Sequence, residues 1–344
     1  MMPDTTAPFL AQLARYRERT LETLLASIPP DEGQPYLYGI IRETLGHAGK
    51  GFRPALCLAT CGAFGGRLED ALYPAAALEL LHNAFLVHDD VEDYSENRHN
   101  HPTVHVRYGM PLAVNTGDAM QALSMRLLRK NAETSGPEAG WRIFEEFDHM
   151  LLRSLEGQAM ELGWIRDNDC QLKTDDYVRM VLRKTCWYSF IHPCRVGALA
   201  ARKDPASLGV FNDFGYYLGA AFQIHDDVLN LTGERQYGKE TCGDLYEGKR
   251  TLMLLHLLEN GTPPEKERLR AMLAKPRQSR SQREVTWVYD LMRERGSIEY
   301  ARQAAREFLA AAEAAFETAY RDSQQNEHRQ FLSSLVRYVV DRDR

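Results

Sequence analysis

The chain has 344 residues, 44% of them hydrophobic, which is enough to form one large helical core. Its formal net charge is −6, with basic residues dispersed among acidic ones, so we do not expect a nucleic-acid partner. No run of eighteen uncharged apolar residues occurs and the first twenty residues contain no apolar signal core, so we expect neither a transmembrane segment nor a secretory signal. The six cysteines include no CxxC pair, which favours buried thiols in a reducing cytoplasm over a disulfide framework or a zinc site.

Hydrophobic residues recur three and four positions apart through most of the chain, which predicts helices. Strand patterns, in which apolar and polar residues alternate between Asn-Gly turns, are almost absent. Helix breakers stand between several of these segments, for example at residues 135–137, 203–205 and 261–264. We therefore predict one all-α domain over residues 1–344. In chain order, the predicted helices span residues 8–28, 34–47, 53–64, 69–95, 112–132, 138–165, 175–202, 207–232, 247–259, 265–275, 282–295, 298–322 and 327–340.

The helix predicted over residues 69–95 is apolar until it ends in a group of aspartates. On a helix, Asp89 and Asp93 lie one turn apart on one face, and Asp90 lies three positions before Asp93. Like charges at this spacing repel each other, and the helix dipole disfavours anions near a C-terminus, unless a cation is bound. Carboxylates without Cys or His ligands favour magnesium, which readily shares phosphate oxygens. We predict a magnesium site here.

A second acidic group, Asp226 and Asp227, interrupts another apolar helix. Either group alone would be explained by a solvated helix end. Two such groups, each in an apolar helix, favour instead a cavity in which magnesium ions join both groups to one diphosphate. Lys50 and Arg53 lie at a predicted loop-to-helix junction, where side chains and helix N-terminal amides can bind an anion.

In their order along the chain, these motifs resemble those of the trans-isoprenyl diphosphate synthases, also called polyprenyl synthetases, between residues 40 and 320. The matching segments are GKGFRP at 49–54, LLHNAFLVHDDVED at 80–93, RHNHPTVHVRYGMPLAVNTGDAM at 98–120, EGQAMELGW at 156–164, RKT at 183–185, FQIHDDVLN at 222–230 and GKETCGDLYEGKRT at 238–251. The resemblance implies an isoprenoid synthase bundle of long antiparallel helices around a deep central cavity, in a homodimer. It also implies a transferase that condenses isopentenyl diphosphate with an allylic diphosphate (dimethylallyl, geranyl or farnesyl) and uses Mg²⁺, with three ions in each active site.

The resemblance also implies a role for individual residues. The magnesium ligands would be Asp89, Asp90, Asp93, Asp226 and Asp227, and Lys184 would complete the catalytic set. The allylic diphosphate would be bound by Arg98, Lys184, Gln223, Lys239 and Lys249, and Thr185 would also belong to the substrate-binding set. Isopentenyl diphosphate would be bound by Lys50, Arg53, His82 and His99.

Three positions depart from the family pattern. Arg98 is followed by His99 where the family usually has a second arginine, which brings the affinity for isopentenyl diphosphate into question, because imidazole is positive only when protonated. Asn230 ends the second acidic motif in place of an aspartate, as it does in eukaryotic-type geranylgeranyl diphosphate synthases. Glu161 stands where the family often has an aspartate, so the side chain at this position is slightly longer.

Product length should depend on the helix that precedes the first acidic group. A growing chain would run past Leu81, Ala84 and Phe85, where Ala84 is small enough to leave a path and Phe85 is bulky enough to close it. An aromatic residue at helical spacing more often simply packs in a core. We predict geranylgeranyl diphosphate as the product, with farnesyl diphosphate as the second candidate.

Two other functions stay open at this stage. A class I terpene cyclase would use the same metal groups on a prenyl diphosphate alone, and the segment 226–234 approaches its second motif. Gly233 is expected to end the helix before Glu234, however, and a cyclase leaves Lys50 and Arg53 without a role. A non-catalytic regulatory subunit of a prenyl synthase would keep the fold, but such subunits typically lose acidic residues that this chain retains.

Overall fold

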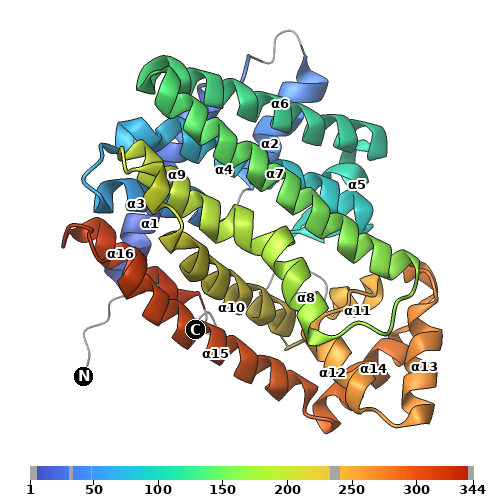
Figure 1. The fold of residues 1–344 in the computed structure, drawn as a ribbon. Coiled ribbons are helices and arrows are strands. Elements are labelled where there is room, and N and C mark those ends of the chain that lie inside the picture. Colours follow the sequence, from blue (N-terminus) through green and yellow to red (C-terminus); the bar gives the residue numbers. More distant parts are fainter. Residues whose placement is uncertain (1–5, 31–33, 48, 233–240, 340–344) are drawn as a thin grey trace.

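The computed structural model describes residues 6–30, 34–47, 49–232 and 241–339, and it is almost entirely helical (Figure 1). The α-helices are α1 (Thr6–Leu25), α2 (Ile40–Gly46), α3 (Phe52–Ala63), α4 (Leu68–Glu92), α5 (Val104–Tyr108), α6 (Met110–Ser135), α7 (Pro137–Arg166), α8 (Thr174–Val181), α9 (His192–Ala200), α10 (Val210–Thr232), α11 (Gly243–Glu247), α12 (Leu252–Asn260), α13 (Pro263–Leu273), α14 (Gln282–Glu294), α15 (Ser297–Ala319) and α16 (Glu327–Tyr338). Two segments are π-helices, η2 (Pro35–Gly39) and η3 (Leu182–Ile191), and two are short 3₁₀ turns, η4 (Pro205–Ser207) and η6 (Arg277–Ser279). The strands β1 (Asn97–Arg98) and β2 (His101–Pro102) form a small antiparallel hairpin. The predicted all-α fold is confirmed.

The long helices pack side by side around α4 and α10. Helix α4 contacts α6, α3 and α1, while α10 contacts α15 and η3. Thirteen of the 25 residues of α4 are buried, because this helix is apolar on nearly all sides and is enclosed by its neighbours. Among the described residues, no helix combines the length and the apolar character needed to cross a bilayer.

Helices α6 and α7 form a tightly packed antiparallel pair along one face of the molecule (Figure 1). The turn between them is Gly136, which has φ of +91°, a conformation that glycine adopts without strain. Gly140 follows in the first turn of α7, where a Cβ atom would lie 2.3 Å from the Cβ of Ala132. A larger residue at Gly140 would therefore force the two helices apart.

The structure differs from the predicted elements in two ways. The helix expected over residues 175–202 is divided into α8, the π-helix η3 and α9, because its hydrophobic period does not distinguish a π-helix from an α-helix. The hairpin β1–β2 and the short helices α5 and α11 were not predicted, since segments of two to five residues carry too few positions to show a period. The helix expected over residues 34–47 is likewise divided, into the π-helix η2 and α2. The other predicted helices are present, with ends shifted by a few residues.

Candidate active site

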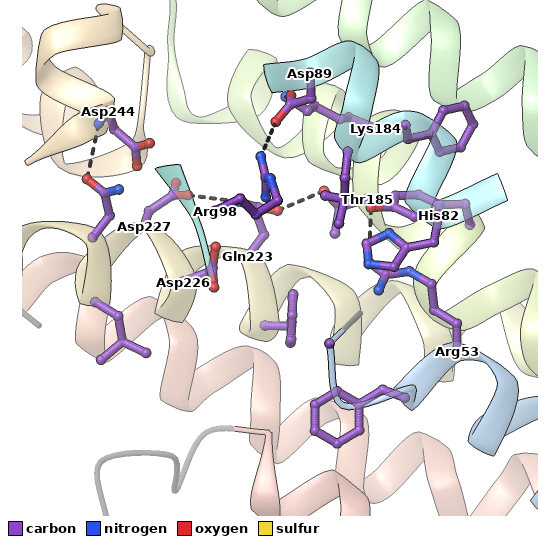
Figure 2. A pocket seen from close by; sticks show the side chains of 18 of the residues that line it. Arg53, His82, Asp89, Arg98, Lys184, Thr185, Gln223, Asp226, Asp227 and Asp244 are labelled. Atoms are coloured by element: carbon purple, nitrogen blue, oxygen red, sulfur yellow. Dashed lines mark hydrogen bonds and ion pairs between the residues drawn. The ribbon is translucent and has the colours of Figure 1, made fainter. Parts of the chain in front are cut away.

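A cavity of about 1360 Å³ lies between α4, α7, η3 and α10. The predicted site residues that line it are Lys50, Arg53, His82, Phe85, Asp89, Arg98, His99, Lys184, Thr185, Gln223, Asp226, Asp227 and Lys249. Figure 2 shows Arg98 between Asp89 and the pair Asp226 and Asp227. Two acidic groups 137 positions apart in the sequence thus share one cavity.

The remaining predicted residues lie elsewhere. Leu81 and Ala84 are fully buried in the packing of α4 and do not line the cavity. Asp90 and Asp93 are also buried, and neither lines the cavity. Lys239 lies outside the described residues, as does Glu234 of the cyclase-like motif.

Arg98 neutralises the first two aspartates. Its Nε lies 2.9 Å from both carboxylate oxygens of Asp90, and its Nη2 lies 3.2 Å from Asp89 Oδ2. Burial alone would lower the pKa of Arg98, but Asp90 and Asp89 raise it, so the guanidinium stays charged. The hairpin positions this arginine, because Arg98 pairs with His101 across β1 and β2.

Asp93 caps the C-terminus of α4 and is paired with a lysine from a distant part of the chain. Lys249 Nζ lies 2.6 Å from Asp93 Oδ2 and 2.8 Å from Glu247 Oε2. Burial raises the pKa of Asp93 to about 7, although Lys249 opposes this shift. Gly248, with φ of +75°, ends α11 and turns the chain so that Lys249 faces α4.

Lys184 lies on the π-helix η3 and forms ion pairs with two acidic residues. It pairs with Glu161 of α7, and its Nζ lies 3.5 Å from Asp89 Oδ1. Burial alone would lower the pKa of Lys184, but the carboxylates of Glu161 and Asp89 raise it. The close approach of α7 and η3 requires Gly157, because a Cβ atom there would lie 2.2 Å from the backbone nitrogen of Lys184.

In the second acidic group, Asp227 is held in place by two hydrogen bonds. Tyr177 Oη donates to Asp227 Oδ2 at 2.8 Å, and Gln223 Nε2 donates to Oδ1 at 2.8 Å. Thr185 in turn donates to Gln223 Oε1 at 2.8 Å, which links η3 to α10. Burial raises the pKa of Asp227 to about 7, despite these hydrogen bonds.

The cavity offers oxygen donors that suit a hard divalent cation. Asp89, Asp226 and Asp227 present carboxylate oxygens to the cavity, and magnesium prefers such ligands. Among the described residues, no three acidic, His or Cys side chains converge closely enough to hold a metal without other ligands. Burial raises the pKa values of Asp93 and Asp227, and a divalent cation bound beside these carboxylates would stabilise their ionised forms. The residues therefore fit magnesium that arrives with the oxygens of a diphosphate.

Basic residues gather at another part of the same cavity (Figure 2). Arg53 Nη2 donates to Tyr188 Oη at 2.9 Å and to Ser189 Oγ at 2.8 Å. Burial, together with the charge of Arg53, lowers the pKa of His82 well below its ordinary value, so His82 is neutral. Within the described part of the chain, Arg53 Nε and His82 Nδ1 are buried without a hydrogen-bond partner. Buried polar atoms of this kind usually have a partner, so both atoms are suited to contact a ligand.

Sequence reasoning missed several residues that complete the site. Tyr177 and Tyr188 belong to no recognisable local motif, and each contacts a site residue far away in the sequence. Glu247 pairs with Lys249 and lies within the segment 238–251, which could have indicated it. Gln158 Nε2 donates to Glu92 Oε2 at 2.6 Å. Because Gln158 lies within the segment 156–164 that resembles the family, the sequence could have indicated this residue as part of the site. The ring of Tyr188 also meets Phe85 edge-on, with the ring centroids 5.4 Å apart.

Comparison with known proteins agrees with this arrangement. The family model described as polyprenyl synthetase matches residues 34–292. A geranylgeranyl diphosphate synthase of Sulfolobus acidocaldarius is 34% identical over 279 residues, which are 81% of this chain and 83% of that protein. The crystal structure of geranylgeranyl pyrophosphate synthetase from Pyrococcus horikoshii superposes with a TM-score of 0.85 at 28% identity, over 99% of this chain and 100% of the other. A polyprenyl synthase from Caulobacter crescentus, complexed with calcium and isoprenyl diphosphate, superposes with a TM-score of 0.84 at 26% identity, over 97% of this chain and 98% of the other.

Proposed function

Because the chain belongs to the polyprenyl synthetase family, we propose that it condenses isopentenyl diphosphate with an allylic diphosphate and releases geranylgeranyl diphosphate. The observation that carries this proposal is the shared cavity, in which two aspartate groups, several cations and an apolar wall meet. The allylic diphosphate would lie between the two aspartate groups, where Arg98, Lys184 and Lys249 supply positive charge. Isopentenyl diphosphate would lie at Lys50, Arg53 and His82.

The residues of the chain would then act on both substrates by charge and by position. Lys184 and Arg98 stabilise the negative charge that develops on the leaving diphosphate. Arg53 and His82 hold the second diphosphate, so that the double bond of isopentenyl diphosphate faces the allylic carbon. The aromatic rings of Phe85 and Tyr188 exclude water from the allylic cation, which would otherwise be quenched to an alcohol.

We propose Mg²⁺ as the metal, with three ions in each site, held by Asp89, Asp226 and Asp227 at the cavity wall and by the buried Asp90 and Asp93. When bound, magnesium acts as a Lewis acid that makes the allylic diphosphate a better leaving group. The Caulobacter crescentus relative, whose crystals contain calcium and isoprenyl diphosphate, supports a divalent cation in this family. Since Arg98 and Lys249 pair with Asp90 and Asp93, both cations would have to exchange partners as the metal and the diphosphate bind.

A geranylgeranyl product is supported by the names of the relatives from Sulfolobus acidocaldarius and Pyrococcus horikoshii. Phe85 projects from α4 into the cavity and packs against Tyr188, so it is suited to limit the length of the product. Ala84 is buried between helices and is not expected to open a path for the growing chain. The predicted location remains the cytoplasm, and this prediction rests only on the cysteines, whose spacing favours free thiols in a reducing compartment.

We also propose that the chain forms a homodimer through α6 and α7. Trp141 and Leu152 on α7 are 61% and 52% exposed, and Phe144 and Val114 lie exposed on the same pair of helices. An apolar surface of this kind is typical of a protein–protein interface. Leu155 is exposed and also lines the cavity, so a second copy on this face would close one side of the active site.

The proposed function is tested by incubating the purified protein with Mg²⁺, isopentenyl diphosphate and each allylic diphosphate in turn, followed by mass analysis of the products. We expect an all-trans C20 diphosphate and no turnover after addition of EDTA. A cyclic hydrocarbon formed from a prenyl diphosphate alone would instead identify a cyclase. Turnover only after a second synthase has been added would indicate a regulatory subunit.

A further inference from the structure

The loop that carries Lys50 leads into α3, whose first turn carries Arg53, and this loop is held by helices from both ends of the chain. From α1, Arg17 Nε donates a hydrogen bond to the backbone oxygen of Gly49 at 3.0 Å. The methylene groups of Arg17 also lie against Gly51, where a Cβ atom would be 3.3 Å from Arg17 Cγ. Gly51 has φ of +71°, so the loop makes a tight left-handed turn directly against this arginine.

Helix α1 presents one face to the cavity. Leu10, Leu13, Ala14 and Arg17 all line it, and their spacing of three and four residues places them on one side of the helix. Three of these residues are apolar, and the fourth, Arg17, is charged. Arg17 stands at the end of the row nearest Lys50 and Arg53. Arg17 is therefore on the wall of the cavity and is also bonded to the loop.

Helix α16 holds the same loop from the other end of the chain. Lys50 Nζ donates to Tyr338 Oη at 3.0 Å and lies 5.2 Å from the centroid of that ring. The two terminal helices fix each other, because Phe9 stacks on Phe331 with the ring centroids 5.0 Å apart. The Oη of Tyr16 and the Nδ1 of His328 are 2.6 Å apart, a second link between the helices.

We propose that Arg17 and Tyr338 are positioning residues for the diphosphate of isopentenyl diphosphate, and that α1 and α16 together shape this half of the site. Arg17 holds the backbone of the loop, and Tyr338 holds the ammonium group of Lys50 at the cavity. Both residues lie outside the segment 34–292 that the family model matches. The proposal rests on the proposed function, which assigns this part of the cavity to isopentenyl diphosphate.

The test measures the affinity of the full-length protein for each substrate by calorimetry, without requiring turnover. For Arg17→Ala we expect the Kd for isopentenyl diphosphate to rise roughly tenfold, and for Tyr338→Phe, which removes only the hydroxyl, about threefold. The Kd for an allylic diphosphate with Mg²⁺ should change less than about twofold in both variants, because Arg98, Lys184 and Lys249 are held by acidic residues of other elements. Matched controls are Arg15→Ala on the exposed face of α1 and Tyr36→Phe at a 73% exposed tyrosine, which should leave both affinities unchanged.

Two results would overturn the proposal. An unchanged Kd for isopentenyl diphosphate in both variants would show that the loop does not depend on the terminal helices. An equal loss of affinity for both substrates would show that the substitutions loosen the whole cavity instead of one half of it. Product formation by the wild-type protein is measured separately, so failure of this proposal is distinguishable from failure of the proposed function.

Discussion

Glu146 on α7 is a buried carboxylate outside the active site, and its replacement should destabilise the fold by a predictable amount. Arg195 of α9 binds it through two nitrogens, each 2.7 Å from a carboxylate oxygen, and His192 Nδ1 lies 2.6 Å from Oε2. Burial alone would raise the pKa of Glu146, but the hydrogen bonds from His192 and Arg195 outweigh it and lower the pKa from 4.5 to about 2. In Glu146→Gln, the charge is lost and Arg195 stays partly buried without its partner.

The size of the effect follows from this pKa. A depression of about 2.5 pH units corresponds to about 3 kcal/mol of unfolding free energy, at 1.36 kcal/mol for each unit. Because the pKa in the folded state is the lower one, this stabilisation is complete above pH 4.5 and is lost as the pH falls through about 2. At pH 3.5 it should have decreased to about 2 kcal/mol.

Denaturant unfolding of the wild type and of Glu146→Gln measures this difference. We expect a gap in unfolding free energy of about 3 kcal/mol at pH 7 that narrows by about 1 kcal/mol at pH 3.5. The neighbouring exposed residue provides the control, because Glu145→Gln should stay within about 0.5 kcal/mol of the wild type. An equal gap at both pH values, or no gap at pH 7, would refute the assignment of the stabilisation to ionised Glu146.

Three further predictions concern the cavity. Asp227→Asn should abolish turnover yet raise the unfolding free energy in EDTA at pH 8 by more than about 1 kcal/mol, and this gain should vanish at pH 4. The reason is that burial raises the pKa of Asp227, so that its ionised form destabilises the fold only at higher pH. Denaturant unfolding at both pH values measures the gain, and a gain that persists at pH 4 would contradict the prediction. Phe85→Ala should lengthen the main product in a mass analysis, and an unchanged product would remove Phe85 as the limit to chain length. Gly157→Ala should lower both activity and thermal stability, because its Cβ would collide with the backbone of Lys184, whereas Gly163→Ala, with no atom within 4 Å of the added Cβ, should behave as the wild type.

The positions of the helices could be read from the sequence because their causes are local. The segment predicted over 282–295, for example, is α14 (Gln282–Glu294), which begins with a capping box between Ser281 and Glu284. The gathering of both acidic groups in one cavity was also predictable, because each group interrupts a helix that is otherwise apolar.

The surroundings of each aspartate were not predictable, because they depend on packing between distant segments. Asp93 was expected on the same face as Asp89, but α4 ends at Glu92, and Asp93 pairs with a lysine 156 positions further along the chain. Ala84 was expected beside the growing product, but it is enclosed by neighbouring helices. No local pattern indicates which side of an apolar helix will face a cavity and which will face another helix.

The π-helix η3 (Leu182–Ile191) sets the orientation of Lys184, in the active-site cavity, relative to α9, which packs in the core. It carries Lys184 into the cavity and leads directly into α9, whose first residue, His192, contacts Glu146. Each turn of a π-helix holds more residues than a turn of an α-helix, so the loss of one residue from η3 would change the winding of this segment and the orientation of α9 relative to Lys184. Hydrophobicity and helix content would hardly change, yet the lysine and the histidine could no longer both reach their carboxylates. This stretch should therefore tolerate many substitutions but few changes in its length.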